Sequence, residues 1–97
     1  MEQFEFNYPA KRKVLKKSHV GVVGSGDLEV LLEPANDVAA SVRIRTSAEG
    51  FESTWKAVMD RFFGQYDGAA SIEINDAGAT PGVVLLRLQQ AVEASER

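Results

Sequence analysis

Ser25 has the setting best suited to chemistry in this sequence. It stands between Gly24 and Gly26 and is followed by Asp27, in the stretch GSGD. The two glycines leave the serine hydroxyl unhindered, so another enzyme could attach a group to it. A serine nucleophile needs a base within hydrogen-bond reach, but the one histidine, His19, would lie about 20 Å away along an extended strand. Modification of Ser25 by another enzyme is therefore favoured over catalysis by Ser25, and the alternative is that GSGD is only a turn, as such a stretch most often is.

Other chemistries find little support in the residue types. The absence of cysteine excludes disulfides and thiolate ligands, and one histidine leaves too few ligands for a histidine-based metal site. GSGDLE begins like a dinucleotide fingerprint, but Glu29 occupies the third glycine position and a strand is expected to follow. The acid pairs Asp27 with Glu29 and Glu73 with Asp76 show no sign of the pocket that general acid catalysis requires. We therefore predict no catalytic residue and no metal site.

Charge is distributed unevenly along the 97 residues, whose net charge is -3. The first 17 residues hold five of the eleven basic residues, while the remainder holds twelve acidic and six basic ones. Such an acidic body repels nucleic acid and attracts basic protein surfaces. The basic stretch KRKVLKK is either a solvated surface loop or a contact for phosphates or an acidic partner. No membrane span or export signal is apparent, so we expect a cytoplasmic protein without membrane insertion.

The turn that presents Ser25 is predicted to join two strands. SHVGVVG and DLEVLLEP flank GSGD and are rich in β-branched residues and leucine, which is typical of a β-hairpin. Alternation of apolar and polar residues predicts further strands in FEFNY, in AASVRIRTS and in ASIEIND. We expect AASVRIRTS to be a third hairpin-connected strand, and AKRKVLKK to be a loop or the irregular entry to the next strand.

Two segments change to the period of an amphipathic helix. The first should end near Gly64, with an apolar stripe of Trp55, Val58, Met59 and Phe62, and we expect its aromatic residues Phe51, Trp55, Phe62 and Phe63 to lie in the core. The second should begin with Thr80 as its cap and Pro81 at its first position, with a stripe of Leu85, Leu88 and Val92. The order β-β-β-β-α-β-α predicts an α+β two-layer sandwich, a mostly antiparallel sheet with two helices on one face, in a single domain spanning residues 1–97.

Two segments resemble a known family. VGVVGSGDLEVLLEP and INDAGATPGVVLLRLQQA are similar to the acyl carrier protein, or delta subunit, of malonate decarboxylase, from about Ser18 to the last helix. The resemblance implies that Ser25 carries 2'-(5''-phosphoribosyl)-3'-dephospho-CoA through a phosphodiester, with Gly24, Gly26 and Asp27 at the same site. The implied partners are a holo-carrier synthase that attaches this group, an acyltransferase subunit that exchanges acetyl for malonyl, a malonyl transferase, and decarboxylase subunits. The thiol that the chain lacks would then come with the group.

Three alternatives remain open. The carrier subunit of citrate lyase uses the same kind of prosthetic group, whereas phosphopantetheine carriers place Asp-Ser-Leu at the start of a helix and are disfavoured. A non-catalytic interaction module would bind a partner through the arginine face of Arg43 and Arg45 and would not need Ser25. A small enzyme is the least favoured, because the composition offers so few catalytic groups.

Overall fold

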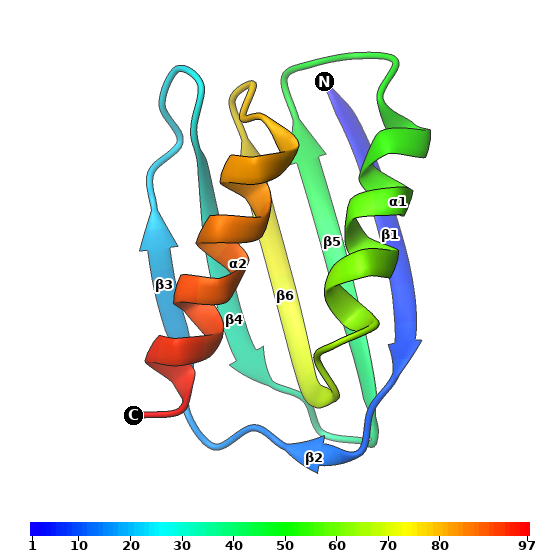
Figure 1. The fold of residues 1–97 in the computed structure, drawn as a ribbon, viewed down its shortest axis with the longest axis vertical. Coiled ribbons are helices and arrows are strands. Elements are labelled where there is room, and N and C mark those ends of the chain that lie inside the picture. Colours follow the sequence, from blue (N-terminus) through cyan, green and yellow to red (C-terminus); the bar gives the residue numbers. More distant parts are fainter.

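A mostly antiparallel sheet forms one layer of the molecule. The computed structural model describes residues 1–97, with the elements β1 Glu2–Pro9, β2 Arg12–Lys13, β3 Ser18–Gly21, β4 Leu28–Pro34, β5 Ala39–Thr46, α1 Glu52–Phe63, β6 Gly68–Asp76 and α2 Pro81–Ser95. In the main sheet the strands lie in the order β1-β5-β6-β4-β3 (Figure 1). Neighbours are antiparallel except for β5 and β6. The predicted α+β fold is therefore confirmed.

The order of the strands differs from the predicted hairpin series. β5 does not pair with β4, because β6 lies between them and pairs with both. β5 and β6 are parallel and are joined through α1, since parallel strands need a crossover connection. The prediction that β5 is a third hairpin-connected strand is wrong. AKRKVLKK, predicted to be a loop or the irregular entry to the next strand, contains the short strand β2, which pairs in parallel with the start of β6.

β6 lies at the centre of the sheet and carries the middle of the core. Its inward side chains pair with inward side chains of β4 and β5, so that two apolar rows cross the sheet: Val42–Ile72–Leu32 and Ile44–Ile74–Val30. Each of these side chains is at most 1% exposed. Full burial of an aliphatic side chain stabilises the fold by about 1.5–3 kcal/mol. The rows therefore fix the register in which the strands present their loops.

α1 packs on the same face of the sheet as α2 (Figure 1). It ends at Gly64, as predicted, and buries Trp55, Met59 and Phe62. We expected Phe51 to lie in the core, but this prediction is wrong. Phe51 precedes the first turn of α1 and is 51% exposed. The start of α1, which Phe51 precedes, lies at the end of the molecule where the β3–β4 and β6–α2 loops also lie (Figure 1).

α2 begins as the sequence predicts. Pro81 is its first residue, and the Thr80 hydroxyl accepts a hydrogen bond from the Val83 N–H at 3.3 Å. Its inward stripe includes Leu88 and Val92, as predicted, but Val84 takes the place of Leu85, which is only half-buried. The stripe follows the helical period and consists of Val84, Leu88, Ala91, Val92 and Ser95. Neither α1 nor α2 has the length and hydropathy needed to cross a membrane.

Candidate functional site

Ser25 lies in the loop between β3 and β4, at one end of the sheet. The Asp27 N–H donates to the Gly24 carbonyl at 2.9 Å and closes a turn whose central residues are Ser25 and Gly26. Gly26 has a φ of +73°, which a type II turn requires at its third position and which glycine adopts freely. Ser25 is exposed. A Cβ at Gly26 would meet no atom within 4 Å, so the space beside the serine is open.

The base of this turn is hydrogen-bonded to the loop between β6 and α2. The Gly26 N–H donates to the Ala77 carbonyl at 2.8 Å, and the Ala77 N–H donates to the Asp27 carbonyl at 2.9 Å. These two bonds continue the ladder of β4 and β6, in which Leu28 pairs with Asp76. The turn is thus an extension of the sheet, and only its tip projects into solvent.

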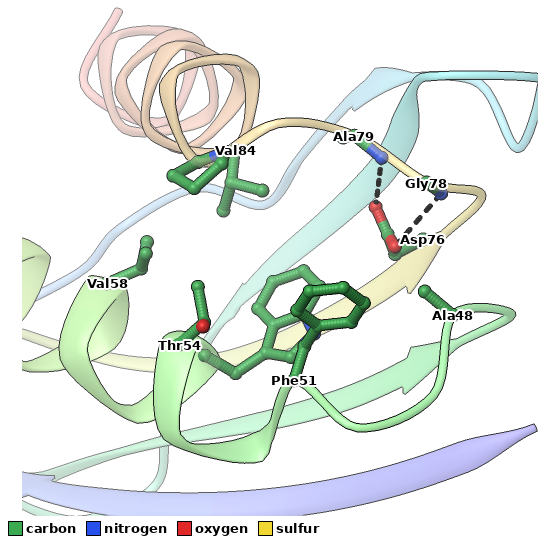
Figure 2. A pocket seen from close by; sticks show the side chains of 10 residues that line it. Ala48, Phe51, Thr54, Val58, Asp76, Gly78, Ala79 and Val84 are labelled. Carbon is green, nitrogen blue, oxygen red and sulfur yellow. Dashed lines mark hydrogen bonds between the residues drawn. The ribbon is translucent and has the colours of Figure 1, made fainter.

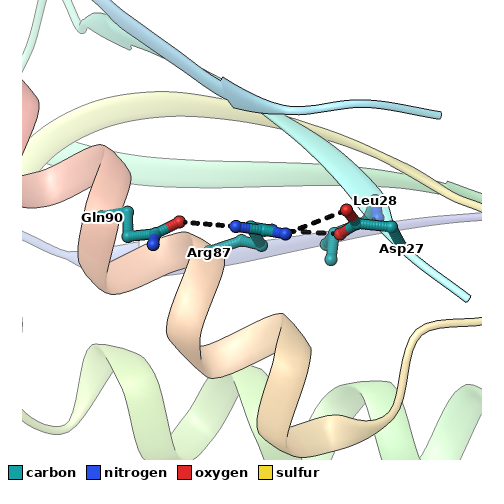
Figure 3. Close-up of polar contacts among 4 residues, drawn as sticks. All are labelled: Asp27, Leu28, Arg87 and Gln90. Carbon is teal, nitrogen blue, oxygen red and sulfur yellow. Dashed lines mark hydrogen bonds and ion pairs between the residues drawn. The ribbon is translucent and has the colours of Figure 1, made fainter. Parts of the chain in front are cut away.

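The side chain of Asp27 is held by α2 (Figure 3). Its carboxylate accepts hydrogen bonds from Arg87 Nε at 3.0 Å and Arg87 Nη2 at 2.9 Å, and from the Leu28 N–H at 2.8 Å. Arg87 Nη1 also donates to the side chain of Gln90 at 3.0 Å. The Arg87 guanidinium, and then the Leu28 N–H, lower the pKa of the Asp27 carboxyl. The bidentate contact between Arg87 and Asp27 fixes the start of β4 against α2 next to Ser25.

Gly21 marks the point where β3 stops and the loop begins. Its φ is +79°, and a Cβ there would lie 2.1 Å from the Leu28 carbonyl oxygen and 3.5 Å from Arg87 Cδ. The sequence interpretation extended this strand to Gly24, but β3 ends at Gly21, and Val22 and Val23 are exposed loop residues. The β-hairpin itself is as predicted, since β3 and β4 pair in antiparallel orientation on either side of the loop.

A buried carboxylate supports the neighbouring β6–α2 loop. Asp76 is 5% exposed. Its oxygens accept hydrogen bonds from the Thr46 hydroxyl at 2.8 Å, the Gly78 N–H at 3.1 Å and the Ala79 N–H at 3.0 Å. Because the Asp76 carboxylate accepts three hydrogen bonds, it fixes the β6–α2 loop, to which the Ser25 turn is hydrogen-bonded.

The acid pairs considered from the sequence do not act as pairs. Asp76 points into the core, whereas Glu73 lies on the outer face of β6, where its carboxylate is 3.6 Å from Arg43. Glu29 likewise lies on the outer face of the sheet, 2.9 Å from the exposed side chain of His19. Each of these acidic residues contacts a neighbour that holds the fold together, and neither pair brings two carboxylates to one site.

The basic stretch contains β2, which lies at the opposite end of the sheet from the β3–β4 loop (Figure 1). β2 pairs with the first residues of β6, while the Ser25 turn is bonded just beyond the last one. The nine residues of β6 span about 30 Å at the rise of an extended strand. The guanidinium of Arg12 contacts groups of this chain at that end: it pairs with Asp67 and Glu96 and lies over the Tyr66 ring. The stretch therefore does not flank the serine.

Arg87 is the residue at the site that sequence reasoning missed. The position of Asp27 after Ser25 places it at the site, but the sequence indicates no partner for its side chain. The available signal was that Arg87 is the one basic residue of α2. Sequence alone could not show that α2 passes beside the β3–β4 loop, because that contact joins residues far apart in the chain.

The fold and this site together define a small domain that presents one serine on a supported turn. Known proteins resemble this chain in sequence and in fold. The sequence model of the malonate decarboxylase delta subunit (MdcD), an acyl carrier protein, matches residues 15–95. The chain is 50% identical to the malonate decarboxylase acyl carrier protein of Pseudomonas savastanoi pv. phaseolicola, over 96% of this chain and 95% of that protein. Its counterpart in Azotobacter vinelandii is 45% identical over the same shares.

A solved structure agrees with these relatives. One chain of a Pseudomonas malonate decarboxylase hetero-tetramer, crystallised in complex with malonate, matches with a TM-score of 0.93 and 47% identity, over 98% of this chain and 99% of that chain. The chain therefore belongs to the malonate decarboxylase acyl carrier protein family. In keeping with the family, it is an acyl carrier subunit and not itself an enzyme.

Proposed function

We propose that Ser25 is the residue to which the prosthetic group of this carrier is attached. The observation that carries the proposal is the setting of its hydroxyl, exposed at the centre of a turn with open space beside it. Membership of an acyl carrier family implies a covalently attached group. We infer that this group is 2'-(5''-phosphoribosyl)-3'-dephospho-CoA, joined through a phosphodiester by a holo-carrier synthase.

The residues around Ser25 fit this role. Gly24 and Gly26 place no side chain against the serine, so a transferase active site can close around the turn. Asp27 was expected to contact the group, but its carboxylate is engaged by Arg87. We therefore assign Asp27 a positioning role, in which it holds the turn in one orientation. The thiol for acyl transfer would be supplied by the attached group, since the chain has no cysteine.

The carrier, a single domain of 97 residues, would pass acyl groups between two kinds of partner subunit. An acyltransferase subunit would exchange a bound acetyl group for malonyl and release acetate. Decarboxylase subunits would then remove CO2, and uptake of a proton would restore acetyl. The names of the relatives favour malonate over citrate as the acid that is processed. We expect this cycle to operate in the cytoplasm.

The test is the intact mass of the chain after co-expression with the enzymes that build and attach the group. We expect a mass increase equal to phosphoribosyl-dephospho-CoA joined with loss of water, mapped to Ser25 by peptide analysis. Ser25→Ala should fold normally and gain no mass, because an exposed side chain contributes little to packing. Ser47→Ala is the matched control, since Ser47 is also exposed in a loop and its N–H donates to the carbonyl of Asp76 at the same end of β6.

The result that would overturn this proposal is an unmodified chain under conditions in which the synthase modifies an authentic carrier. Modification that persists in Ser25→Ala would assign the group to another residue. If Ser25→Ala also leaves the decarboxylase complex fully active, the interaction-module alternative replaces the carrier function.

A further inference from the structure

A small apolar pocket opens between the start of α1 and the start of α2. Its volume is about 250 Å³, and Figure 2 shows Phe51 and Val84 on opposite sides of it. Its apolar lining is completed by Ala48, Trp55, Val58, Ala79 and Pro81. Pockets for drug-sized ligands measure about 300–1,000 Å³, so this one suits a group of only a few atoms. The half-exposed ring of Phe51 extends the apolar surface at its mouth.

The pocket and the Ser25 turn both adjoin the β6–α2 loop. The turn that holds Ser25 is hydrogen-bonded to Ala77. The next two residues, Gly78 and Ala79, line the pocket. A Cβ at Gly78 would meet no atom within 4 Å, so the space over this glycine is open. A flexible group attached to Ser25 can therefore cross the β6–α2 loop at Gly78 and enter the pocket.

The charges around the pocket favour a neutral ligand. Asp76 is the one charged residue that lines it, and no basic side chain does. The N-termini of α1 and α2 carry partial positive charge. The hydroxyl of Thr80 accepts a hydrogen bond from one N–H of α2, and the acidic Glu52 lies in the first turn of α1. An anion would lose its water in the pocket and meet a carboxylate, which is unfavourable.

We propose that this pocket binds the acetyl thioester that the carrier bears at Ser25 and excludes the malonyl thioester. The inference rests on the proposed function of Ser25. The methyl of the acetyl group contacts the apolar walls, while the extra carboxylate of malonyl keeps that cargo in solvent. The carrier thereby shields the acetyl form from hydrolysis and leaves the malonyl form accessible to the decarboxylase subunits.

The fluorescence of Trp55 tests the proposal directly, because Trp55 lines the pocket and is the only tryptophan. Carrier with a modified Ser25, verified by mass, is loaded with acetyl or with malonyl. We expect the emission of Trp55 to change with acetyl and to stay as in the free thiol with malonyl. Cleavage of the acetyl thioester by hydroxylamine should be about fourfold slower than in a Phe51→Ala variant, the factor that burial of one methyl-sized group provides.

Leu86→Ala is the matched control for Phe51→Ala. Leu86 is 52% exposed, nearly the same as Phe51, but lies outside the pocket. This variant should cleave at the wild-type rate. A second measurement does not depend on attachment: S-acetyl-N-acetylcysteamine added to the unmodified chain should change the emission of Trp55, and the malonyl analogue should not.

The outcomes separate the two proposals. If Ser25 gains no mass, the attachment proposal fails, and the cysteamine probes still test the pocket. If Ser25 is modified but acetyl and malonyl forms have equal emission and equal cleavage rates, the pocket proposal is wrong. Equal protection of the malonyl form would overturn the selectivity. Weaker binding of Phe51→Ala to the decarboxylase subunits, without any response to acetyl, would show that the pocket receives a partner side chain instead.

Discussion

The glycines around Ser25 have different structural roles, although they look alike in the sequence. Gly21 must be glycine for two reasons, because its φ is positive and a side chain would strike the Leu28 carbonyl. Gly26 has a positive φ but open space around it. Gly24 has neither constraint, since its φ is not positive and a Cβ would meet its nearest atom at 3.7 Å. These three positions should therefore tolerate alanine to different degrees.

We predict a ranked loss of stability in the three alanine variants. Gly21→Ala should lower the free energy of unfolding by more than about 2 kcal/mol, because backbone strain and a steric clash add. Gly26→Ala should cost about 1 kcal/mol for strain alone, and Gly24→Ala should be close to neutral. Urea denaturation followed by Trp55 fluorescence measures all three. Equal losses at Gly24 and Gly26 would contradict a turn in which only Gly26 has a positive φ.

At the scale of the elements, local patterns predicted which segments form strands and helices but not how they assemble. The stripe of α1 and the cap of α2 depend on residues a few positions apart, so the sequence displays them. The placement of β6 between β4 and β5 depends on contacts between distant residues. The same limit applies to the site: the Ser25 turn could be predicted, whereas the contact of Asp27 with Arg87 joins residues 60 positions apart.

The cap of α2 gives a prediction at this scale. Thr80→Ala removes the hydroxyl that accepts the Val83 N–H, and we expect it to lower the free energy of unfolding by about 1 kcal/mol. Thr80→Ser keeps the hydroxyl and should retain most of the stability. Thermal or urea denaturation of the two variants distinguishes them. A loss of the same size in both would mean that the methyl group, and not the hydrogen bond, supports the start of α2.

At the scale of the whole molecule, three ion pairs on separate parts of the surface predict how stability depends on pH. The pKa of each aspartate is lowered chiefly by its basic partner, in the pairs Asp27–Arg87, Asp60–Lys56 and Asp67–Arg12. A carboxyl whose pKa is lowered by folding contributes stability above its unfolded pKa of about 3.9, and loses it as the pH falls through the folded value. The free energy of unfolding should therefore fall below about pH 4.

The measurement for this prediction is urea denaturation across a series of pH values. The wild-type chain should lose stability below about pH 4, and a variant with all three aspartates changed to asparagine should show a shallower loss. The variant is less stable than the wild type at neutral pH, since it lacks the ion pairs. Parallel curves for the two proteins would show that other groups govern unfolding in acid.

The Ser25 turn and the basic stretch lie at opposite ends of the molecule. Ser25 lies at one end, and the basic stretch lies about 30 Å away at the other, by the rise of β6. The hypothesis that this stretch contacts phosphates near the attachment point is disfavoured by that distance. Its lysines make no ion pair within the chain, and Leu15 among them is 83% exposed. We therefore expect the stretch to contact an acidic surface on a partner subunit.

A variant of the basic stretch tests partner binding and Ser25 modification separately. In it, glutamine replaces Lys11, Lys13, Lys16 and Lys17. Arg12 is kept for its contacts to Asp67 and Glu96. The variant should bind the decarboxylase subunits more weakly, and its affinity should depend less on salt, because fewer charge pairs are screened. Modification of Ser25 should proceed at the wild-type rate if the synthase approaches only the opposite end. Unchanged affinity at every salt concentration would make the stretch a solvated loop, whereas slower modification would place the synthase across the length of the carrier.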